Sequence, residues 1–393
     1  MSEPLSPHRS IVSPPNTAVK STGPHRLRIE FTGSGSEYFR IWIVNLLLTV
    51  VTLGLYYPWA KVRRLRYFRG STLVGGEPLD FHGDPKKMLK GYLLVLVLFG
   101  LYSVAGKFSP TAGFIAFLIV AGIWPALLKS SMQFQMANTS WRGMRFRFVG
   151  SLSGAYRAWF PVFVPSVLLL GALAAAGDAK QAPVWVGFLA LAVMLVGLVG
   201  SPWLLWNLKR YQHDHYALAT LQTSFRATLG SIYTLCLKSF GLLVLASTLP
   251  MAAVAMFAFG IKAQGTKMGH FSPLLAVVPL VLMVILLVLL KPYFTARLQN
   301  LVWTRTGNSS LRFRSALKVR SLTLLTLKNW LFVVLTLGLY WPFAAVAMAR
   351  LRLQAVRVET KRDPQELVNR MRVMEGDAAG DAAGDFLGFD LGL

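Results

Sequence analysis

Histidines and acids that could do chemistry are few in this 393-residue sequence, and most lie apart from one another. His213 and His215 flank Asp214, a spacing that two metal-binding imidazoles could use on a strand but less readily on a helix. No further ligand type lies nearby, so the sequence favours a solvated loop over a metal site. His82 lies close to Asp84, which we expect to cap a helix, so this pair is assigned a structural role.

The sequence also lacks the short motifs that mark common catalytic sites. It contains no P-loop, no GxSxG nucleophile motif and no HExxH zinc motif. The single cysteine, Cys236, excludes an intramolecular disulfide and a cluster of cysteine ligands. We therefore expect no catalytic residues, no metal and no cofactor, and the sequence predicts that the protein is not an enzyme.

Two near-copies of one segment are the strongest candidates for a functional motif. Thr52–Ala60 reads TLGLYYPWA and Thr336–Ala344 reads TLGLYWPFA. Such a pair could form broken helices around a solute path, or an aromatic belt at the membrane surface where a proline ends the helix, which we favour. Asn45, inside an apolar run, is expected to make an interhelical hydrogen bond rather than line a path. The candidate path or structural residues are Asn45, Thr52, Gly54, Tyr56, Pro58, Trp59, Thr336, Gly338, Tyr340 and Pro342.

Composition predicts the element type that must position these residues. The apolar fraction is 54% and the charged fraction is only 15%, against about 25% charged residues in a soluble domain. Several apolar runs reach the roughly 18 residues that a membrane span needs. Expected helices lie near residues 41–60, 88–106, 112–128, 159–177, 184–206, 239–260, 274–290 and 330–348. The predicted fold class is an all-α integral membrane protein, a multi-span bundle of degenerate repeats with small cytoplasmic β-hairpins.

The internal repeat is read from prolines and from the segments that follow them. Apolar runs end near Pro58, Pro125, Pro202, Pro292 and Pro342. Hairpin-like segments then follow at Ser71–Phe81, Asn138–Phe148 and Val302–Phe313, with a degraded copy at Thr220–Phe225 and an expected unpaired strand at Leu27–Phe31. Because a lone hairpin is marginal in water, we expect these ribbons to pack together or against basic helices on one membrane face.

Charge indicates which side of the membrane the loops occupy. The net charge is +25, yet the links after the second, fourth and sixth runs carry only Lys107, Lys180, Lys262 and Lys267. The alternate, arginine-rich loops are therefore expected to be cytoplasmic. There, Arg63, Arg64 and Arg66 are candidate contacts for anionic lipid headgroups. Nucleic acid is not an expected partner, because the basic residues lie between apolar runs.

The first and last runs leave two topologies open. If both cross the membrane, there are eight spans and both tails are periplasmic; segment length favours this. If both are re-entrant, there are six full spans and both tails are cytoplasmic, which the repeat and the flanking charges favour. We expect eight helical segments with the outer two irregular.

The ends of the chain differ in composition from the middle. Residues 1–26 are rich in Ser and Pro and are expected to be a disordered tail. The repeat-built transmembrane domain is placed at 27–350. A short amphipathic helix is expected at 363–374, followed by a disordered acidic Gly/Ala tail at 375–393.

The stretch Phe31–Phe68, FTGSGSEYFRIWIVNLLLTVVTLGLYYPWAKVRRLRYF, resembles the YjgN-like family of bacterial inner-membrane proteins, a domain-of-unknown-function family. Arg145–Phe148 and Leu311–Ser315 also fit, so the resemblance covers most of residues 27–350. It implies a multi-pass protein of the bacterial inner membrane and no established activity. The acidic Gly/Ala tail departs from the family.

Two functions remain open from the sequence. The first is a carrier or passive pore for a small solute, with the TLGLYxP segments lining a path. The alternative is a non-transporting protein that organises the membrane or interacts with lipid. All 16 acidic residues lie outside the apolar runs, which counts against proton- or sodium-coupled transport through a buried carboxylate.

Overall fold

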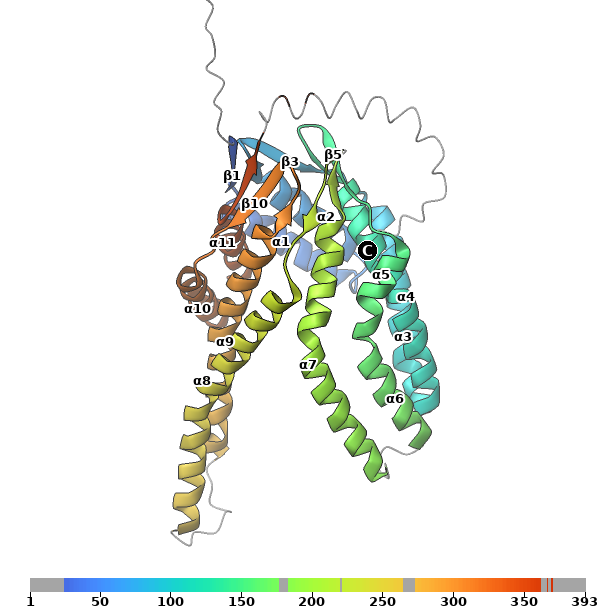
Figure 1. The fold of residues 1–393 in the computed structure, drawn as a ribbon, viewed down its shortest axis with the longest axis vertical. Helices are drawn as coiled ribbons and strands as arrows, with labels where there is room; N and C mark the ends of the chain where they lie inside the picture. Colours follow the sequence, from blue (N-terminus) through green and yellow to red (C-terminus); the bar gives the residue numbers. More distant parts are fainter. Residues whose placement is uncertain are drawn as a thin grey trace, which may run out of the picture.

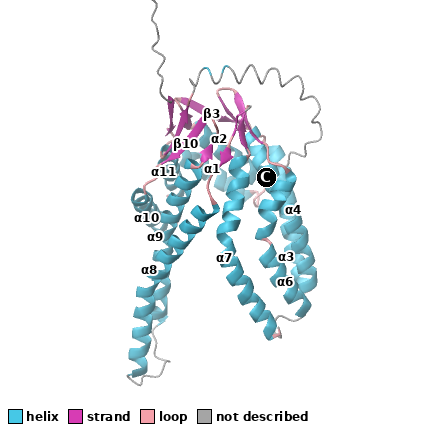
Figure 2. Cartoon of the chain, viewed as in Figure 1, coloured by secondary structure: helices cyan, strands magenta, loops and turns pink. Residues whose placement is uncertain are grey.

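The computed structural model describes residues 25–176, 183–219, 221–263 and 273–361, together with Glu366 and Asn369. Helices dominate, and strands gather at one end, from which most helices lead away (Figures 1 and 2). Of the tail expected at residues 1–26, only residues 25 and 26 are described, and they begin the first strand. The helix expected at 363–374 and the tail expected at 375–393 lie outside the described residues, apart from Glu366 and Asn369. The ordered fold runs from His25 to Thr360, beyond the expected limits of 27 and 350.

Within the described residues, one order of elements recurs: strand, helix, helix, strand. We call the five stretches units 1 to 5. Unit 1 contains β1 (His25–Phe31), α1 (Gly35–Val51), α2 (Tyr57–Gly70) and β2 (Thr72–Val74). Unit 2 contains β3 (Glu77–Phe81), α3 (Pro85–Phe108), α4 (Pro110–Ala137) and β4 (Thr139–Trp141).

The other three units follow the same order with local changes. Unit 3 contains β5 (Met144–Phe148), α5 (Leu152–Trp159), the 3-10 helix η1 (Phe160–Val162), α6 (Val164–Ala176), α7 (Val184–Asp214) and β6 (Tyr216–Leu218). Unit 4 contains β7 (Leu221–Gln222), β8 (Ser224–Phe225), α8 (Leu229–Ala263), α9 (Pro273–Thr304) and β9 (Thr306–Gly307). Unit 5 contains β10 (Leu311–Ser315), α10 (Val319–Leu335), α11 (Trp341–Gln354) and β11 (Val356–Thr360).

The strands form a single 11-stranded sheet in the order β7-β6-β5-β4-β3-β2-β1-β11-β10-β9-β8. The expected all-α fold is therefore not confirmed, because the small hairpins join into one sheet. Separate hairpins would leave the hydrogen-bonding groups of their edge strands unpaired, and the sheet pairs most of them. The expectation of an unpaired strand at Leu27–Phe31 is wrong, because β1 pairs with both β2 and β11. The two edge strands, β7 and β8, are separated only by Thr223, so the sheet is nearly closed.

The helices close the same ring. Helix α1 contacts α11, α2 contacts α3, α4 contacts α5 and α6, α7 contacts α8, and α9 contacts α10. Each unit therefore packs on the next, and unit 5 packs on unit 1 although no chain links them directly.

Polar side chains hold successive units together through one recurring hydrogen bond to backbone. Arg66 donates to the Gly83 carbonyl of unit 2 at 3.2 Å, and Arg350 of unit 5 donates to the Gly33 carbonyl of unit 1 at 2.8 Å. Each acceptor lies two residues after the last residue of its unit's opening strand. The same position is used at two further junctions, where Asn300 donates to Leu317 and Trp206 donates to Ala227, both at 2.9 Å. The junction without a covalent link thus has the same bond as its neighbours.

The interior of the sheet is an apolar core. Trp141 and Met144 are buried, and they pack against side chains from the part of the sheet between β1 and β7. These are Leu27, Val74, Leu79, Phe146, Leu218, Ala219 and Leu221. Leu27 on β1 and Leu218 on β6 reach the same cluster although their strands are not neighbours in the sheet. One apolar cluster therefore joins side chains of the strands from β1 to β7.

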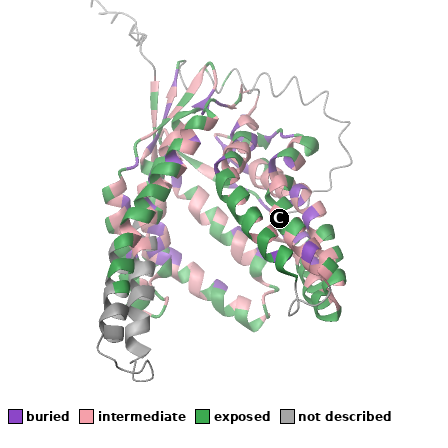
Figure 3. Cartoon of the chain, turned by 60° about the horizontal axis from the view of Figure 1, so that its bottom comes forward, coloured by how far each residue is buried: buried purple, intermediate pink, exposed green. Residues whose placement is uncertain are grey.

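Several helices fit a membrane span by length and composition. Among the described residues they are α3, α4, α7 and the Leu229–Thr248 part of α8. A fifth span is added if Leu152–Val162 and Val164–Ala176, which are bent by 56° relative to each other, cross the membrane as one segment. These spans contain the expected runs at 88–106, 112–128 and 184–206 and overlap those at 159–177 and 239–260. Figure 3 shows exposed positions along the helices that lead away from the sheet. The run at 274–290 lies in the helical backbone of α9.

The runs at 41–60 and 330–348 are each broken in two. Helix α1 stops at Val51, and α2 begins at Tyr57 and returns to a strand that pairs with β1. The backbone amide of Gly54 donates to the Thr49 carbonyl at 2.7 Å and that of Gly338 to the Val333 carbonyl at 2.8 Å, the closing bond of a Schellman helix end. Each run therefore forms a helical hairpin and not one straight helix, and both ends of each hairpin lead into paired strands of the sheet.

Candidate functional site

The TLGLYxP turns satisfy their own polar groups. The Thr52 hydroxyl donates to the Leu48 carbonyl at 2.7 Å and accepts from the Tyr56 amide at 3.0 Å. The Thr336 hydroxyl likewise donates to the Phe332 carbonyl at 2.6 Å and accepts from the Tyr340 amide at 2.9 Å. The threonine hydroxyls therefore stabilise the turns, and their hydrogens are already used in hydrogen bonds within the chain and are not available to a solute.

The two turns belong to adjacent units. Helices α1 and α11 are in contact, and the rings of Phe39 and Phe343 lie 5.7 Å apart. Tyr56 stacks on Trp59 at 5.9 Å and Tyr340 stacks on Phe343 at 5.5 Å, while the side chains of Pro58 and Pro342 are fully buried. Helices next to the two motif copies are therefore in contact, and each copy forms an aromatic, proline-anchored turn.

Asn45 has an equivalent that the sequence reading missed. Asn45 is 7% exposed, and its Oδ1 accepts a long hydrogen bond of 3.5 Å from Arg63 Nη1. Asn329 is 6% exposed; its Nδ2 donates to the Ala344 carbonyl at 3.4 Å and its Oδ1 has no partner. Each asparagine precedes the glycine of its motif by nine residues, so extending the alignment of the two copies towards the N-terminus would have found Asn329.

The histidine pair does not form a solvated loop. His213 is 5% exposed at the end of α7, makes a 3.1 Å hydrogen bond with the Thr306 hydroxyl and packs edge-on against Trp303. That expectation is wrong, because a residue from unit 4 covers the imidazole. Asp214 accepts from the Phe225 amide at 2.6 Å. The expected cap is confirmed at Asp84, whose carboxylate accepts from the Lys86 amide at 2.9 Å.

The arginines proposed to bind headgroups each have a contact within the chain. Arg63 lies over the Tyr56 ring at 5.7 Å and Arg64 over the Phe68 ring at 5.8 Å. Arg66 donates its hydrogen bond to the Gly83 carbonyl of unit 2. All three side chains remain exposed, so they can face headgroups, but they do not gather into one site.

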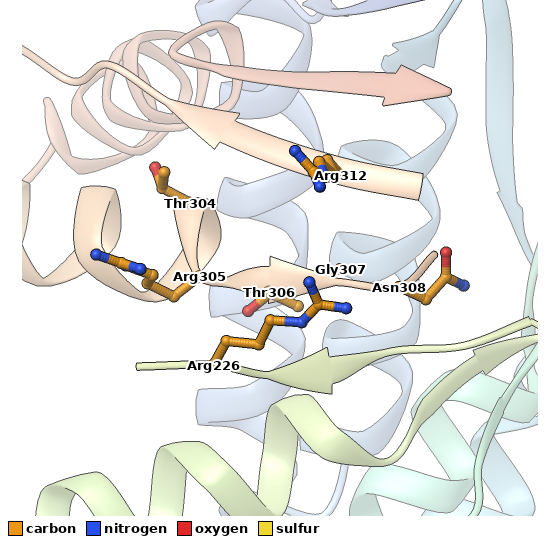
Figure 4. Close-up of a pocket in the computed structure, with 7 residues that line it drawn as sticks. All are labelled: Arg226, Thr304, Arg305, Thr306, Gly307, Asn308 and Arg312. Atoms are coloured by element: carbon orange, nitrogen blue, oxygen red, sulfur yellow. The ribbon is translucent and has the colours of Figure 1, made fainter. Parts of the chain in front are cut away.

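A different group of arginines does gather. A cavity of about 230 Å³ lies between β8, β9 and β10, where α8 and α9 join the sheet (Figure 4). It is lined by Arg226, Thr304, Arg305, Thr306, Gly307, Asn308 and Arg312. We call it the arginine pocket. The TLGLYxP turns do not line it.

Strand pairing builds the arginine pocket. The Arg226 amide donates to the Arg305 carbonyl at 2.8 Å, and Arg312 lies opposite Gly307 in the register of β9 and β10. A Cβ at Gly307 would lie 2.6 Å from the Leu311 carbonyl oxygen, so a side chain there would collide with the backbone of the turn. All three arginines are exposed, on the side of the strands opposite to buried residues such as Phe225.

The arginine pocket is electropositive. The ion pairs found among the described residues use Glu77, Asp214 and Glu359, and none involves Arg226, Arg305 or Arg312. Guanidinium groups bind phosphate and carboxylate through paired hydrogen bonds, so the pocket suits an anionic group. Apolar and polar residues alternate in LRFRS, and this alternation predicts that Arg312 lies on the exposed face of its strand. The sequence does not show that Arg226 lies near Arg312, because that depends on the pairing of β8 with β9.

Comparison with known proteins finds relatives along the whole fold. An inner membrane protein YjgN of Salmonella typhimurium is 26% identical over 381 residues, which cover 92% of this chain and 95% of the relative. The YjgN proteins of Escherichia coli O157:H7 and of strain K12 are each 29% identical over 142 residues, 36% of this chain and 35% of theirs. No solved structure matches the chain.

The relatives and the apolar helices agree on location: the protein resides in the bacterial inner membrane, which it crosses several times. The family described as a bacterial protein of unknown function, DUF898, matches residues 26–386. The chain belongs to this DUF898 family, as the TLGLYxP motif had suggested.

Proposed function

We propose that the protein binds anionic phospholipid headgroups and organises the membrane leaflet on the side of its sheet, without catalysing a reaction. The observation that carries the proposal is the pair of exposed leucines at the tips of the two short helical hairpins. Leu53 and Leu337 are each 95% exposed.

These leucines occupy a costly backbone conformation. Leu53 has φ 51° and Leu337 has φ 49°. A side chain in the left-handed region costs roughly 1–2 kcal/mol, and glycine would avoid this cost. The hydrogen bonds that close each turn offset part of this cost. Neither leucine side chain packs within the chain, so it is free to contact an apolar environment outside it. Hydrocarbon is the environment in which an exposed leucine gains most.

Helix length supports insertion into one leaflet. The apolar part of α1, from Ile41 to Val51, rises about 16 Å at 1.5 Å per residue, roughly half of a 30 Å hydrocarbon core. Helix α3, with 24 residues, extends about 36 Å by the same measure. Adjacent units 1 and 5 therefore enter one leaflet, while the longer pairs cross. Lipid of the opposite leaflet fills the space beneath the short pairs and thins there.

The distribution of charge supports headgroup binding on the side of the molecule where these hairpins join the sheet. The arginine pocket and the exposed strand arginines lie on the sheet side of the molecule, which we place in the cytoplasm because the strand-side loops carry most lysines and arginines. Each such charge contributes about 1 kcal/mol near an anionic surface. The proposed partner is therefore an anionic headgroup and not nucleic acid.

We also infer that the five units derive from one degenerate repeat. In units 1 to 3 a phenylalanine ring covers a glycine two residues later, as Phe81 covers Gly83, leaving 2.5 Å between a Cβ built at that glycine and the ring. In unit 4 the position is Ala227 and in unit 5 it is Leu317. The repeat supplies the ring, and differences between units supply the lipid contacts.

A carrier or passive pore for a small solute is the second candidate. The presence of two matched glycine-interrupted turns in neighbouring units favours it, because such matched breaks often frame a substrate site. The satisfied hydroxyls of Thr52 and Thr336 and the apolar core around Trp141 give it less support, since both remove polar groups or space from a path.

The test compares lipids retained by the purified protein in mixed anionic and zwitterionic nanodiscs. Exchanging Arg226 and Arg312 for Gln should lower retention of anionic lipid by about tenfold, since two charged hydrogen-bond donors are lost. Exchanging Arg145 and Arg147 for Gln removes the same charge from exposed positions of β5 and measures the general attraction to an anionic surface, so the tenfold loss is counted relative to this control. Equal retention in both double variants contradicts the proposed pocket. Uptake of a solute by proteoliposomes would favour the second candidate.

A further inference from the structure

Arginines from distant parts of the sequence lie opposite one another on the outer face of the sheet. The strand register places Arg28 of β1 opposite Arg357 of β11, and it places Arg357 opposite Arg314 of β10. Residues directly opposite each other in antiparallel strands point to the same face, with their Cβ atoms about 4.5–5.5 Å apart. All three arginines are exposed, so this face is the outer one.

The line of arginines continues over the next two strands. Strands β9 and β10 pair at Gly307 and Arg312, so two residues further along each chain Arg305 lies opposite Arg314. A hydrogen bond of 3.3 Å between the residue after Arg314 and the residue before Arg305 keeps the two chains side by side at this level. On the other side of Arg305, its carbonyl accepts from the Arg226 amide at 2.8 Å. We call these five residues the arginine row: Arg28, Arg357, Arg314, Arg305 and Arg226.

Little negative charge compensates the arginine row. Glu359 pairs with Arg314 at 2.9 Å. The other four arginines of the row make no ion pair and no side-chain hydrogen bond within the part of the chain that the structure describes. Like charges that lie directly opposite each other destabilise a sheet, so an anion that contacts several of these arginines would relieve the repulsion.

The length of the arginine row indicates a linear ligand. Neighbouring strands lie about 4.7–4.9 Å apart, so the four steps of the row span roughly 19 Å. A single small anion reaches only part of that length. A chain that carries negative charge along its whole length can contact every arginine of the row.

We propose that the arginine row binds a linear chain of linked phosphate groups. Guanidinium groups bind phosphate oxygens through paired hydrogen bonds, and such a chain presents these oxygens on every unit. An extended acidic peptide presents its carboxylates on one face only at every second residue, about 6.6 Å apart, which does not match the spacing of the strands.

Single-stranded nucleic acid fits the arginine row less well. Proteins that bind it stack its bases on aromatic side chains. As far as the structure describes these five strands, their outward positions hold no aromatic side chain.

The proposal goes beyond headgroup binding and does not depend on it. The arginine row shares Arg226 and Arg305 with the arginine pocket, whereas Arg28 and Arg357 lie outside the pocket. Membranes without anionic lipid contain no competing headgroup. An experiment in such membranes therefore tests the row alone, and either proposal can fail without the other.

The test measures the Kd of linear inorganic polyphosphate for the full chain in nanodiscs of zwitterionic lipid by titration calorimetry. Orthophosphate, polyglutamate and single-stranded RNA, each at the same concentration of charge, are the reference ligands. Polyphosphate should bind most tightly. The double variant Arg28→Gln with Arg357→Gln should raise its Kd about a hundredfold, because two charged contacts of about tenfold each are lost. This variant should fold as the wild type does, since it removes two like charges that lie opposite each other.

Matched variants separate the arginine row from general attraction to a basic protein. Arg145→Gln with Arg147→Gln removes the same charge from exposed positions of β5 and should raise Kd far less. Arg28→Lys with Arg357→Lys keeps the charge and should keep most of the affinity. The proposal is overturned if polyphosphate binds no more tightly than orthophosphate, or if the β5 variant loses as much affinity as the Arg28 and Arg357 variant. Tighter binding of polyglutamate or of RNA would also overturn it, because the row would then suit an acidic peptide or nucleic acid.

Discussion

Units 1 and 5 pair their strands as units 2 and 3 do. They differ in the segment that comes before the proline in the second long helix of each unit, the helix that leads back to the sheet. In α4 and α7, Pro125 and Pro202 lie inside the helix, after long apolar stretches. In α2 and α11, Pro58 and Pro342 occupy the first turn, and the TLG turn stands where the apolar stretch would be. The part of the unit that builds the ring is therefore separable from the part that crosses the membrane.

Proline is tolerated for different reasons in the first turn of a helix and inside a helix. At the start of a helix its missing amide leaves no bond unmade, whereas inside a helix it removes one hydrogen bond and bends the axis. Pro125 is fully buried inside α4, so packing from neighbouring helices offsets that loss.

The largest predicted effect concerns the junction that closes the ring. Arg350→Gln should destabilise the protein by about 1.5–3 kcal/mol, because a charged hydrogen bond to the Gly33 carbonyl is lost where no chain joins the units. Arg66→Gln removes the equivalent bond beside the hairpin of β2 and β3 and should cost less. Thermal unfolding in detergent gives both values. A larger loss in Arg66→Gln would show that the closing junction is not the weaker one.

The next effect concerns the turns that shorten units 1 and 5. Gly54 has φ 92° and Gly338 has φ 93°, so alanine at either position should cost about 1–2 kcal/mol in backbone strain. The two costs should agree, because the two turns have the same hydrogen bonds. Gly100→Ala, within α3 and with open space around it, should leave stability equal or raised. A neutral Gly338→Ala would contradict the strained turn.

The smallest effect distinguishes the two buried asparagines. Asn329→Leu should be neutral or stabilising by less than about 1 kcal/mol, since it removes a buried carbonyl oxygen that has no partner. Asn45→Leu should destabilise, because it strips Arg63 of its acceptor. The free energy of unfolding of both variants is measured by chemical unfolding. Equal losses of stability would contradict the predicted difference between the two asparagines.

Local features of this fold were accessible from the sequence. Apolar runs predicted the helices, glycine-containing alternating segments predicted the hairpins, and Asp84 predicted its helix cap. The return of the Thr52 and Thr336 hydroxyls to their own helices follows equally from local chemistry. All of these depend on residues a few positions apart.

Features made by distant pairing were not accessible. The pairing of β1 with β11 joins the two ends of the described chain, and no turn marks it. The burial of His213 depends on Thr306 of the next unit, and the arginine pocket depends on β8 lying beside β9. Positional periodicity shows which face a residue occupies but not which strand it meets.

The depth of the two leucine tips tests the central claim most directly. Spin labels at positions 53 and 337, and at exposed Phe108 at the end of α3, would be compared in a Cys236→Ser background in bilayers. Labels at 53 and 337 should be reached by dissolved oxygen and shielded from a water-soluble nickel complex, whereas the label at 108 should be reached by the nickel complex. Nickel access at 53 and 337 equal to that at 108 would contradict insertion into a single leaflet.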